Sequence, residues 1–233
     1  MKQFSTAMVL VLMLASCGGG AQTADDIISK NIKARGGYEK VKSLKSVMME
    51  GRAITGNKSV GMNVYYNNLK AMRTEYIVGK KKAYIILTAA AGWTYNPVTD
   101  SVPVATKDIY VRDGFFQLDV QGLFVDYKTK GYKAEYNGKD TAGGKQCDKI
   151  TLKKEGEGDK IYFFDAAFLL QKATTYRLRD NGKYEPVDIY FFDYRNTDEG
   201  YLFSYRRFTS GAQYLFDKVT ANAVMPQSLF QPD

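Results

Sequence analysis

The sequence lacks histidine altogether, holds only two cysteines, and has no apolar run long enough to span a bilayer, which takes about 20 residues. Without imidazole there is no Ser-His-Asp triad, no histidine base and no histidine-ligated metal. Two cysteines make neither a disulfide scaffold nor a four-cysteine zinc site. We therefore expect a protein that is not an enzyme, with no catalytic residues, no metal and no cofactor.

Aromatic side chains are abundant: the chain has 18 tyrosines, 13 phenylalanines and one tryptophan. Charged residues make up 25% and hydrophobic residues 45% of the 233 positions, which are ordinary fractions for a folded protein. The length fits one domain with a substantial core. The formal charge is +8, but the chain has no concentrated basic block, so we expect no nucleic acid partner.

The first 16 residues have the proportions of an export signal. Lys2 gives a short basic start, and residues 7–15 form a compact apolar run. The motif Leu-Ala-Ser-Cys over 14–17 resembles the lipobox of bacterial lipoproteins, in which the cysteine becomes the first mature residue and carries the lipid. We predict a lipoprotein signal peptide over 1–16 and lipid attachment at Cys17. The alternative is an ordinary signal peptide with a chance cysteine.

A glycine-rich stretch follows, and it predicts a flexible tether over 17–23. Position 18 is Gly and not Asp, the inner-membrane retention signal of well-studied lipoprotein systems, which favours the outer membrane. We expect an exported protein, anchored to the outer membrane through Cys17 and facing the periplasm. Residues 24–233 are expected to form a single domain.

Two helical regions are expected in that domain. Thr23 is a suitable N-cap for the first, and Asp25 and Asp26 stand where the helix dipole favours acids. The pair Gly36-Gly37 ends this helix, and a further short turn follows over 38–44. The second region lies within 105–126, an apolar stretch expected to be a buried or lid-like insertion between two groups of strands.

Most other segments alternate with a period of two residues, which predicts strands. In the first, over 46–55, Val47 and Met49 share one face while Glu50 and Arg52 share the other. Among the turn signals, Asn137-Gly138 favours a tight hairpin. About eleven antiparallel strands exceed what a flat sheet holds, so we expect a mainly β fold whose sheet curls, with a few helices plugging its concave face.

Four stretches resemble the LolA-like outer-membrane lipoprotein-sorting family. They are residues 24–51, with Gly36-Gly37 and Gly51, then 92–97, 131–165 and 219–232. They cover nearly the whole mature chain, as diffuse strand and turn patterns and not as a compact signature. The resemblance implies a half-open antiparallel β-barrel whose helices cover the concave face and whose apolar interior receives acyl chains.

Within that family, soluble members carry lipoproteins across the periplasm, and lipid-anchored relatives receive them at the outer membrane or carry other lipids. Cys17 departs from the soluble carrier, so the resemblance favours a tethered receptor or lipid-binding protein, whose partners are acyl chains of lipoproteins or other lipids. Arg52 and Arg73 stand on early strands, but a period of two points both outward, so neither is assigned a functional role.

A groove for an acyl chain should be lined by large apolar side chains of the strands and of the insertion. The candidates are Met49, Met62, Tyr66, Met72, Tyr76, Leu87, Trp93, Phe115 and Phe116. Burying a CH₂ group contributes about 0.8 kcal/mol, so a sixteen-carbon chain offers roughly 12 kcal/mol before entropy costs. Methionines adapt to variable chains, although they also fill gaps in ordinary cores.

The alternative is a structural or interaction lipoprotein that contacts other envelope proteins and whose barrel core is filled by its own side chains. A continuous apolar cavity distinguishes the two interpretations, because only lipid binding needs one.

Overall fold

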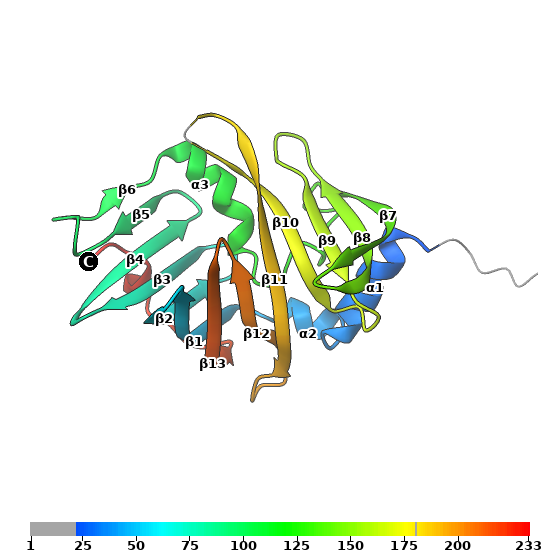
Figure 1. Ribbon diagram of the computed structural model, residues 1–233, viewed down its shortest axis with the longest axis horizontal. Helices are drawn as coiled ribbons and strands as arrows, with labels where there is room; N and C mark the ends of the chain where they lie inside the picture. The colour runs from blue at the N-terminus through cyan, green and yellow to red at the C-terminus, as the bar shows by residue number, and fades with distance from the viewer. Residues whose placement is uncertain (1–21, 180) are drawn as a thin grey trace, which may run out of the picture.

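The computed structural model describes residues 22–179 and 181–233. Within these residues, 13 strands form one antiparallel sheet in the order β6-β5-β4-β3-β2-β1-β13-β12-β11-β10-β9-β8-β7 (Figure 1). The end strands β6 and β7 do not pair with each other, so the curled sheet stays open. The expected mainly β, half-open barrel is confirmed. The strand count exceeds the expected eleven, partly because β6 has two residues, too few for a sequence pattern.

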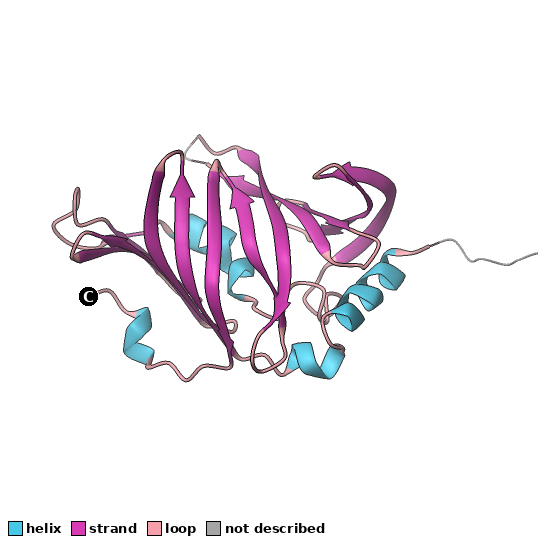
Figure 2. Ribbon diagram, turned by 60° about the horizontal axis from the view of Figure 1, so that its bottom comes forward, coloured by secondary structure: helices cyan, strands magenta, loops and turns pink. Residues whose placement is uncertain are grey.

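The strands are β1 Ser46–Thr55, β2 Lys58–Asn67, β3 Ala71–Val78, β4 Lys81–Thr88, β5 Gly92–Tyr95, β6 Val104–Ala105, β7 Lys133–Ala142, β8 Lys145–Lys153, β9 Lys160–Phe164, β10 Leu170–Leu178, β11 Tyr184–Asn196, β12 Leu202–Thr209 and β13 Ala212–Ala221. The helices are α1 Ala24–Ala34, α2 Tyr38–Lys42 and α3 Asp108–Gly114, with 3-10 turns η1 Phe115–Leu118 and η2 Gln227–Phe230. Helix α3 and turn η2 lie on opposite faces of the sheet (Figure 2).

Helix α1 begins and ends where the sequence predicts. The Thr23 hydroxyl accepts a hydrogen bond from the Asp26 amide at 3.1 Å, and the Asp26 carboxylate accepts one from the Thr23 amide at 3.0 Å. This reciprocal capping satisfies amides that the first turn leaves unpaired. Beyond α1, Gly36 and Gly37 adopt φ angles of 104° and 92°, which end the helix. The buried face of α1 carries Ile27 into the core.

Strand β1 shows the predicted alternation. Val47 and Met49 are buried on the concave face, while Glu50 and Arg52 are exposed on the convex face. The pairing of β1 with β13 shifts register at Gly51. A Cβ atom at Gly51 would lie 2.0 Å from the carbonyl oxygen of Leu215, so this close approach of two backbones requires glycine.

The predicted hairpin at Asn137-Gly138 is wrong. Pairing of β7 with β8 continues beyond it after a register shift, so Gly138, at φ 78°, belongs to a β-bulge. The chain reverses instead at Gly143-Gly144, with φ angles of 58° and 77°. Positive φ at both central residues is what a two-residue hairpin loop needs, and two glycines supply it with less strain than Asn-Gly.

The C-terminal segment, which comprises η2 and residues 231–233, changes the surroundings of Arg73. This side chain points to the convex face, as predicted, yet it is only 2% exposed because η2 and the residues after it cover β3 and β4. Its guanidinium donates to Glu75 at 2.9 Å, stacks 4.2 Å from the Tyr84 ring centroid and donates to the carbonyl of Gln231 at 3.1 Å. Arg73 is therefore a buried link between the sheet and the C-terminal segment.

Candidate functional site

Residues 115–125, here called the strap, cross the concave face and join its halves. At one end Leu118 packs with Leu87 of β4 and with Val111 of α3. In the middle Val120 contacts the cluster built on β1, β2 and β13. At the other end Phe124 packs against the strands β8 and β9, 4.7 Å from the Tyr162 ring centroid. The predicted buried or lid-like insertion is thus an internal crossbar.

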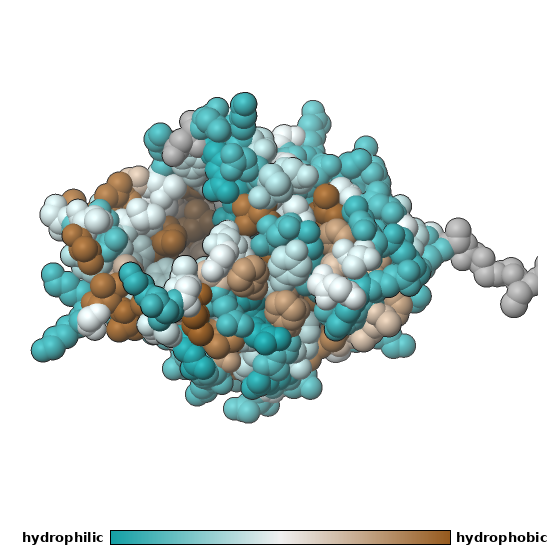
Figure 3. All heavy atoms as spheres, in the orientation of Figure 1, coloured by the Kyte–Doolittle hydropathy of each residue, from teal (hydrophilic) through white to brown (hydrophobic). Residues whose placement is uncertain are grey.

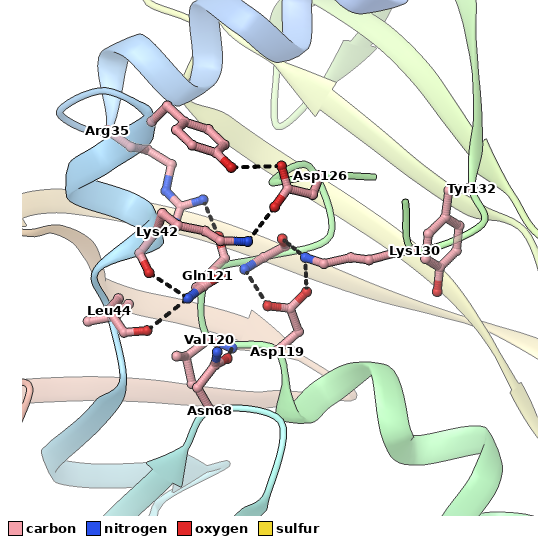
Figure 4. A network of polar contacts seen from close by, with 12 residues as sticks. Arg35, Lys42, Leu44, Asn68, Asp119, Val120, Gln121, Asp126, Lys130 and Tyr132 are labelled. Carbon is pink, nitrogen blue, oxygen red and sulfur yellow. Dashed lines mark hydrogen bonds and ion pairs between the residues drawn. The ribbon is translucent and has the colours of Figure 1, made fainter. Parts of the chain in front are cut away.

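Hydrogen bonds hold the strap in place, because irregular backbone over an apolar surface needs polar partners. The side-chain amide of Gln121 donates to the backbone carbonyl oxygens of Lys42 at 2.7 Å and Leu44 at 3.1 Å. Arg35 donates to the Gln121 carbonyl at 2.9 Å, and the Val120 amide donates to the Asn68 side chain at 3.1 Å (Figure 4). The strap is therefore fixed to the C-cap of α1, to the end of α2, to Leu44 before β1 and to the β2–β3 turn.

An ion pair stiffens the strap further. The Asp119 carboxylate accepts from Lys130 at 2.6 Å and from the Gly122 amide at 3.2 Å, and Lys130 also donates to the Gly122 carbonyl at 3.1 Å (Figure 4). Close by, Lys42 pairs with Asp126, which also accepts from the Tyr38 hydroxyl. These contacts tie Asp119 of the strap to Lys130, and they tie Asp126, which follows the strap, to α2.

Two cavities lie between the strap and the concave sheet. The larger has a volume of about 280 Å³ and is walled by the strap, by α1 and by strands β9 to β12. The smaller, of about 200 Å³, is walled by the strap, β1, β2 and β12. The residues that line both are Gln117, Asp119, Val120, Phe203 and Arg207. The two spaces are therefore neighbours. Each is smaller than the roughly 300–1,000 Å³ that small-molecule pockets occupy, and only together do they reach that range.

A third cavity, of about 450 Å³, lies on the opposite side of the strap. Phe116, Asp119 and Leu123 line both this outer cleft and the larger inner cavity, so they form the wall between them. The far side of the cleft holds a cluster of charges: the carboxylate of Glu157 accepts from Tyr132 at 2.7 Å and from Lys160 at 2.6 Å. Apolar and charged surfaces thus face each other across the cleft.

The concave face is not fully covered beside α3. Ile85 lies on the same side of β4 as Leu87, but it is 43% exposed whereas Leu87 is buried beneath α3 and η1. Figure 3 shows a hollow with apolar atoms in this region of the molecule. The interior therefore has an open side next to the covered cavities.

The interior is poorly solvated, as the tyrosines show. Burial raises the pKa of Tyr76 to about 12, with a smaller contribution from neighbouring Tyr214. Burial likewise raises the pKa of Tyr162 and of Tyr194 well above their usual values. An environment that disfavours phenolate disfavours any unpaired charge, and it favours apolar ligand surface.

Eight of the nine predicted groove residues lie on the concave side or the strap. Met49 and Tyr66 line the smaller inner cavity, Phe116 lines the larger one and the outer cleft, and Phe115 lines the outer cleft. Met62 and Tyr76 pack into the adjoining cluster of β1 and β2, and Met72 packs with Leu87. Several of these side chains therefore support the cavity walls without lining them.

Trp93 lies apart from this set. It pairs with Ile86 in the β4–β5 register, and directly paired residues share a face, here the convex face of Arg73. There it lines a separate depression together with Phe230 of the C-terminal segment.

Sequence reasoning did not identify the arginines of the interior. Arg35 and Arg207 line the larger cavity, and Arg177 donates to the Gln117 side chain at 3.1 Å. Burial lowers the pKa of both Arg35 and Arg177 from the usual range. No alternation singles out Arg207, because Leu202 and Ser204, which have the opposite phase on β12, line the same cavity.

Other predicted features lie elsewhere. Cys147 is buried, as expected of a small apolar residue, and burial raises the pKa of its thiol. Over the described residues, no group of three or more Cys, Asp or Glu side chains is arranged to hold a metal ion. None of the helices described is long and apolar enough to span a membrane. Cys17 and the rest of 1–21 lie outside the described residues.

No family model and no curated protein matches the sequence. Solved structures share its fold. An outer membrane lipoprotein-sorting protein domain from Vibrio parahaemolyticus is 10% identical, with a TM-score of 0.55 over 89% of this chain and 95% of that one. A LolA superfamily protein from Nitrosomonas europaea is 13% identical, with a TM-score of 0.56 over 91% and 98%. A DUF1329 family protein from Desulfovibrio piger is 11% identical, with a TM-score of 0.56 over 89% and 97%. The chain therefore has the LolA-like fold.

Proposed function

We propose that this protein binds the acyl chains of lipoproteins or of other lipids and releases them unchanged, in lipoprotein sorting or lipid transport. The observation that carries the proposal is the pair of cavities between the strap and the concave sheet, with volumes of about 280 and 200 Å³. Most side chains around the larger one are apolar, Phe124 and Leu170 among them. The partly covered, mainly apolar space of the larger cavity suits a hydrocarbon chain.

The fold supports the same proposal. The sorting domain from Vibrio parahaemolyticus and the LolA superfamily protein share the architecture of this chain, although at 10% and 13% identity they indicate fold and not ligand. The alternative, an interaction lipoprotein with a filled core, requires that side chains fill the space beneath the strap. The two cavities there favour lipid binding.

We further propose that the protein is anchored to the outer membrane through a lipid on Cys17 and that it faces the periplasm. The lipobox-like motif at 14–17 supports the anchor. The first described residue, Gln22, hydrogen-bonds Asp148 of β8 at 3.3 Å, so the proposed tether would leave the domain beside the β7–β8 end of the sheet. A single tethered domain over 24–233 completes the proposal.

Native mass spectrometry of protein purified without detergent tests the ligand. We expect adducts with the masses of lipids, released on delipidation and regained with added lipid; a protein that is consistently empty and takes up no lipid contradicts the proposal.

A separate experiment tests the anchor. Cys17→Ala should abolish incorporation of radiolabelled palmitate and change the membrane fractionation. Cys147→Ala, which removes the other cysteine, should incorporate palmitate and fractionate with membranes as wild type does. Unchanged labelling of Cys17→Ala contradicts the anchor without bearing on lipid binding by the domain.

A further inference from the structure

Arg207 of β12 is a cation on the concave face of the sheet. It pairs in register with Phe191 and Tyr214, and it lines both inner cavities. Its guanidinium lies 5.9 Å from the Phe191 ring centroid and 5.2 Å from that of Phe216. A positive charge thus stands within an otherwise aromatic wall.

This guanidinium has few polar partners. Its Nε atom is buried and has no hydrogen-bond partner among the described residues. One Nη atom contacts the Met49 sulfur at 3.8 Å, which is a weak acceptor. No carboxylate in the described part of the chain forms an ion pair with Arg207. Because a buried donor without a partner is unfavourable, such a group in a native protein calls for a specific explanation.

The other charged groups around the larger cavity do not neutralise Arg207. Arg35 adds a second guanidinium, and both arginines lower the pKa of Tyr194, in opposition to its burial. Asp119 is the acidic residue of this lining, and its carboxylate is already paired with Lys130 at 2.6 Å. The balance of charge at the cavity is therefore positive.

A third arginine extends the positive region. Arg177 donates through Nη2 to the Gln117 side chain at 3.1 Å, while its Nε atom is also buried and without a partner in the described residues. Asp113 of α3 raises the pKa of Arg177, against the larger effect of burial, so this guanidinium is partly compensated. Gln117 lines both inner cavities, so Arg177, which lines neither, adds its charge from behind this residue.

Apolar surface continues from this positive region. The larger cavity also has Leu123, Phe124 and Leu170 in its walls, which offer burial but no hydrogen bonds through their side chains. A ligand that satisfies both surfaces has an anionic oxygen group at one end and a hydrocarbon chain at the other. Arginine is suited to both carboxylate and phosphate because it presents paired donors.

We propose that the cavity selects anionic amphiphiles and that Arg207 binds their carboxylate or phosphate group while the chain lies under the strap. The proposal rests on the proposed function, because it presupposes that acyl chains enter the cavity. It adds a ligand class, anionic and not neutral lipids, and it assigns Arg207 as the residue that discriminates them.

Competition with a photoactivatable dodecanol tests the proposal, with the mature lipidated protein in phosphatidylcholine nanodiscs. Dodecanoate, dodecyl phosphate and dodecanol serve as competitors of equal chain length. We expect at least one anion to displace the label at a concentration about tenfold or more below the concentration of dodecanol that does so. Hydrogen bonds to a charged group are strong enough to give a difference in affinity of this size. The comparison of dodecanoate with dodecyl phosphate identifies the preferred head group.

Three variants complete the design. Arg207→Met should reduce the preference for anions over dodecanol to within about twofold, since it removes charge and keeps apolar bulk. Arg207→Lys should keep part of the preference. Arg206→Met is the matched control, because this neighbouring arginine is exposed and its loss should change nothing. Circular dichroism confirms that each variant is folded.

Two results overturn the proposal while the proposed function stands. In the first, the anions and dodecanol displace the label from wild-type protein at equal concentrations. In the second, Arg207→Met protein keeps the full preference for anions. The proposed function fails if the label reacts with no residue of the cavity in wild-type protein and if no competitor reduces its reaction with the protein. The anion proposal then fails with it.

Discussion

The guanidinium of Arg73, on β3, donates to the carboxylate of Asp233 at 2.6 Å across a separation of 160 positions in the chain. Arg73 also donates to Glu75, which pairs with Lys82 at 2.8 Å. Both Arg73 and Glu75 are only 2% exposed. The C-terminal segment therefore closes over a charged pair that would otherwise face water.

Arg73→Met should destabilise the protein by about 3 kcal/mol, because removal of one partner leaves Glu75 buried with only Lys82. Urea unfolding measures the loss. Arg52→Met is the matched control: Arg52 pairs with Asp217 at 3.5 Å in an exposed position, so its loss should stay within about 0.5 kcal/mol. Equal effects of the two substitutions would show that burial by the C-terminal segment is unimportant.

Gly51→Ala should cost about 3 kcal/mol or more, since the new methyl group would meet the Leu215 carbonyl and backbone must shift. Thermal and urea unfolding measure the change. Gly61→Ala, on the strand paired with this part of β1, is the control. There the new atom would lie 3.1 Å from the side chain of Ile77, which is partly exposed and can move, so we expect little change. A stable Gly51→Ala protein would contradict the close approach.

Glu157 should make stability depend on acid. Burial raises its pKa, but hydrogen bonds from Lys154, Lys160 and Tyr132 outweigh burial and bring the pKa to about 2, below the usual 4.5. Because the folded pKa is the lower one, the unfolded chain binds the extra proton first. The stabilisation is therefore complete above pH 4.5 and is lost as the pH falls from 4.5 towards 2.

Glu157→Gln tests this dependence. The variant should be less stable than wild type at pH 7 and should lose less stability between pH 4.5 and pH 2, the window set by the two pKa values. Urea midpoints across this range measure it. Glu135→Gln, which removes an exposed pair with Lys153 at 2.6 Å, should follow the wild-type profile. Parallel profiles for all three proteins would refute the role of Glu157.

Val120→Trp should block the inner cavities, because Val120 lines both of them. We expect lipid uptake at least about tenfold weaker, from the loss of several buried CH₂ groups, and a stability cost of about 1–3 kcal/mol from overpacking. Native mass spectrometry and urea unfolding measure the two effects. Val224→Trp, at a position that is 101% exposed, should bind lipid normally. Full uptake by Val120→Trp would place the ligand elsewhere.

Local patterns predicted the strands and the helix caps because the forces that decide them are local. The alternation of Val47 and Met49 with Glu50 and Arg52 assigned both faces of β1 correctly, and Thr23 with Asp26 marked the start of α1. At Asn137-Gly138 the same logic failed, because two glycines further along offered a less strained loop and pairing of β7 with β8 could continue to them.

Contacts between distant segments were beyond prediction. The surroundings of Trp93 and Arg73 depend on the C-terminal segment, which no period-two pattern relates to β3 or β5. Arg207 was not identified from the sequence, because only the strap and strands from both halves of the sheet create the cavity that it lines. Cavities arise from packing between elements, so the sequence indicated that an interior exists and not where it is empty.

The open ends of the sheet have a consequence at high protein concentration, where neighbouring copies meet. An unpaired strand is a template for aggregation. One end, β6, has only two residues, Val104–Ala105. The other, β7, exposes Lys133, Glu135 and Lys139 and is interrupted by a bulge. Shortness at one edge, and charge with irregular spacing at the other, allow crowded molecules to stay separate without a closed barrel.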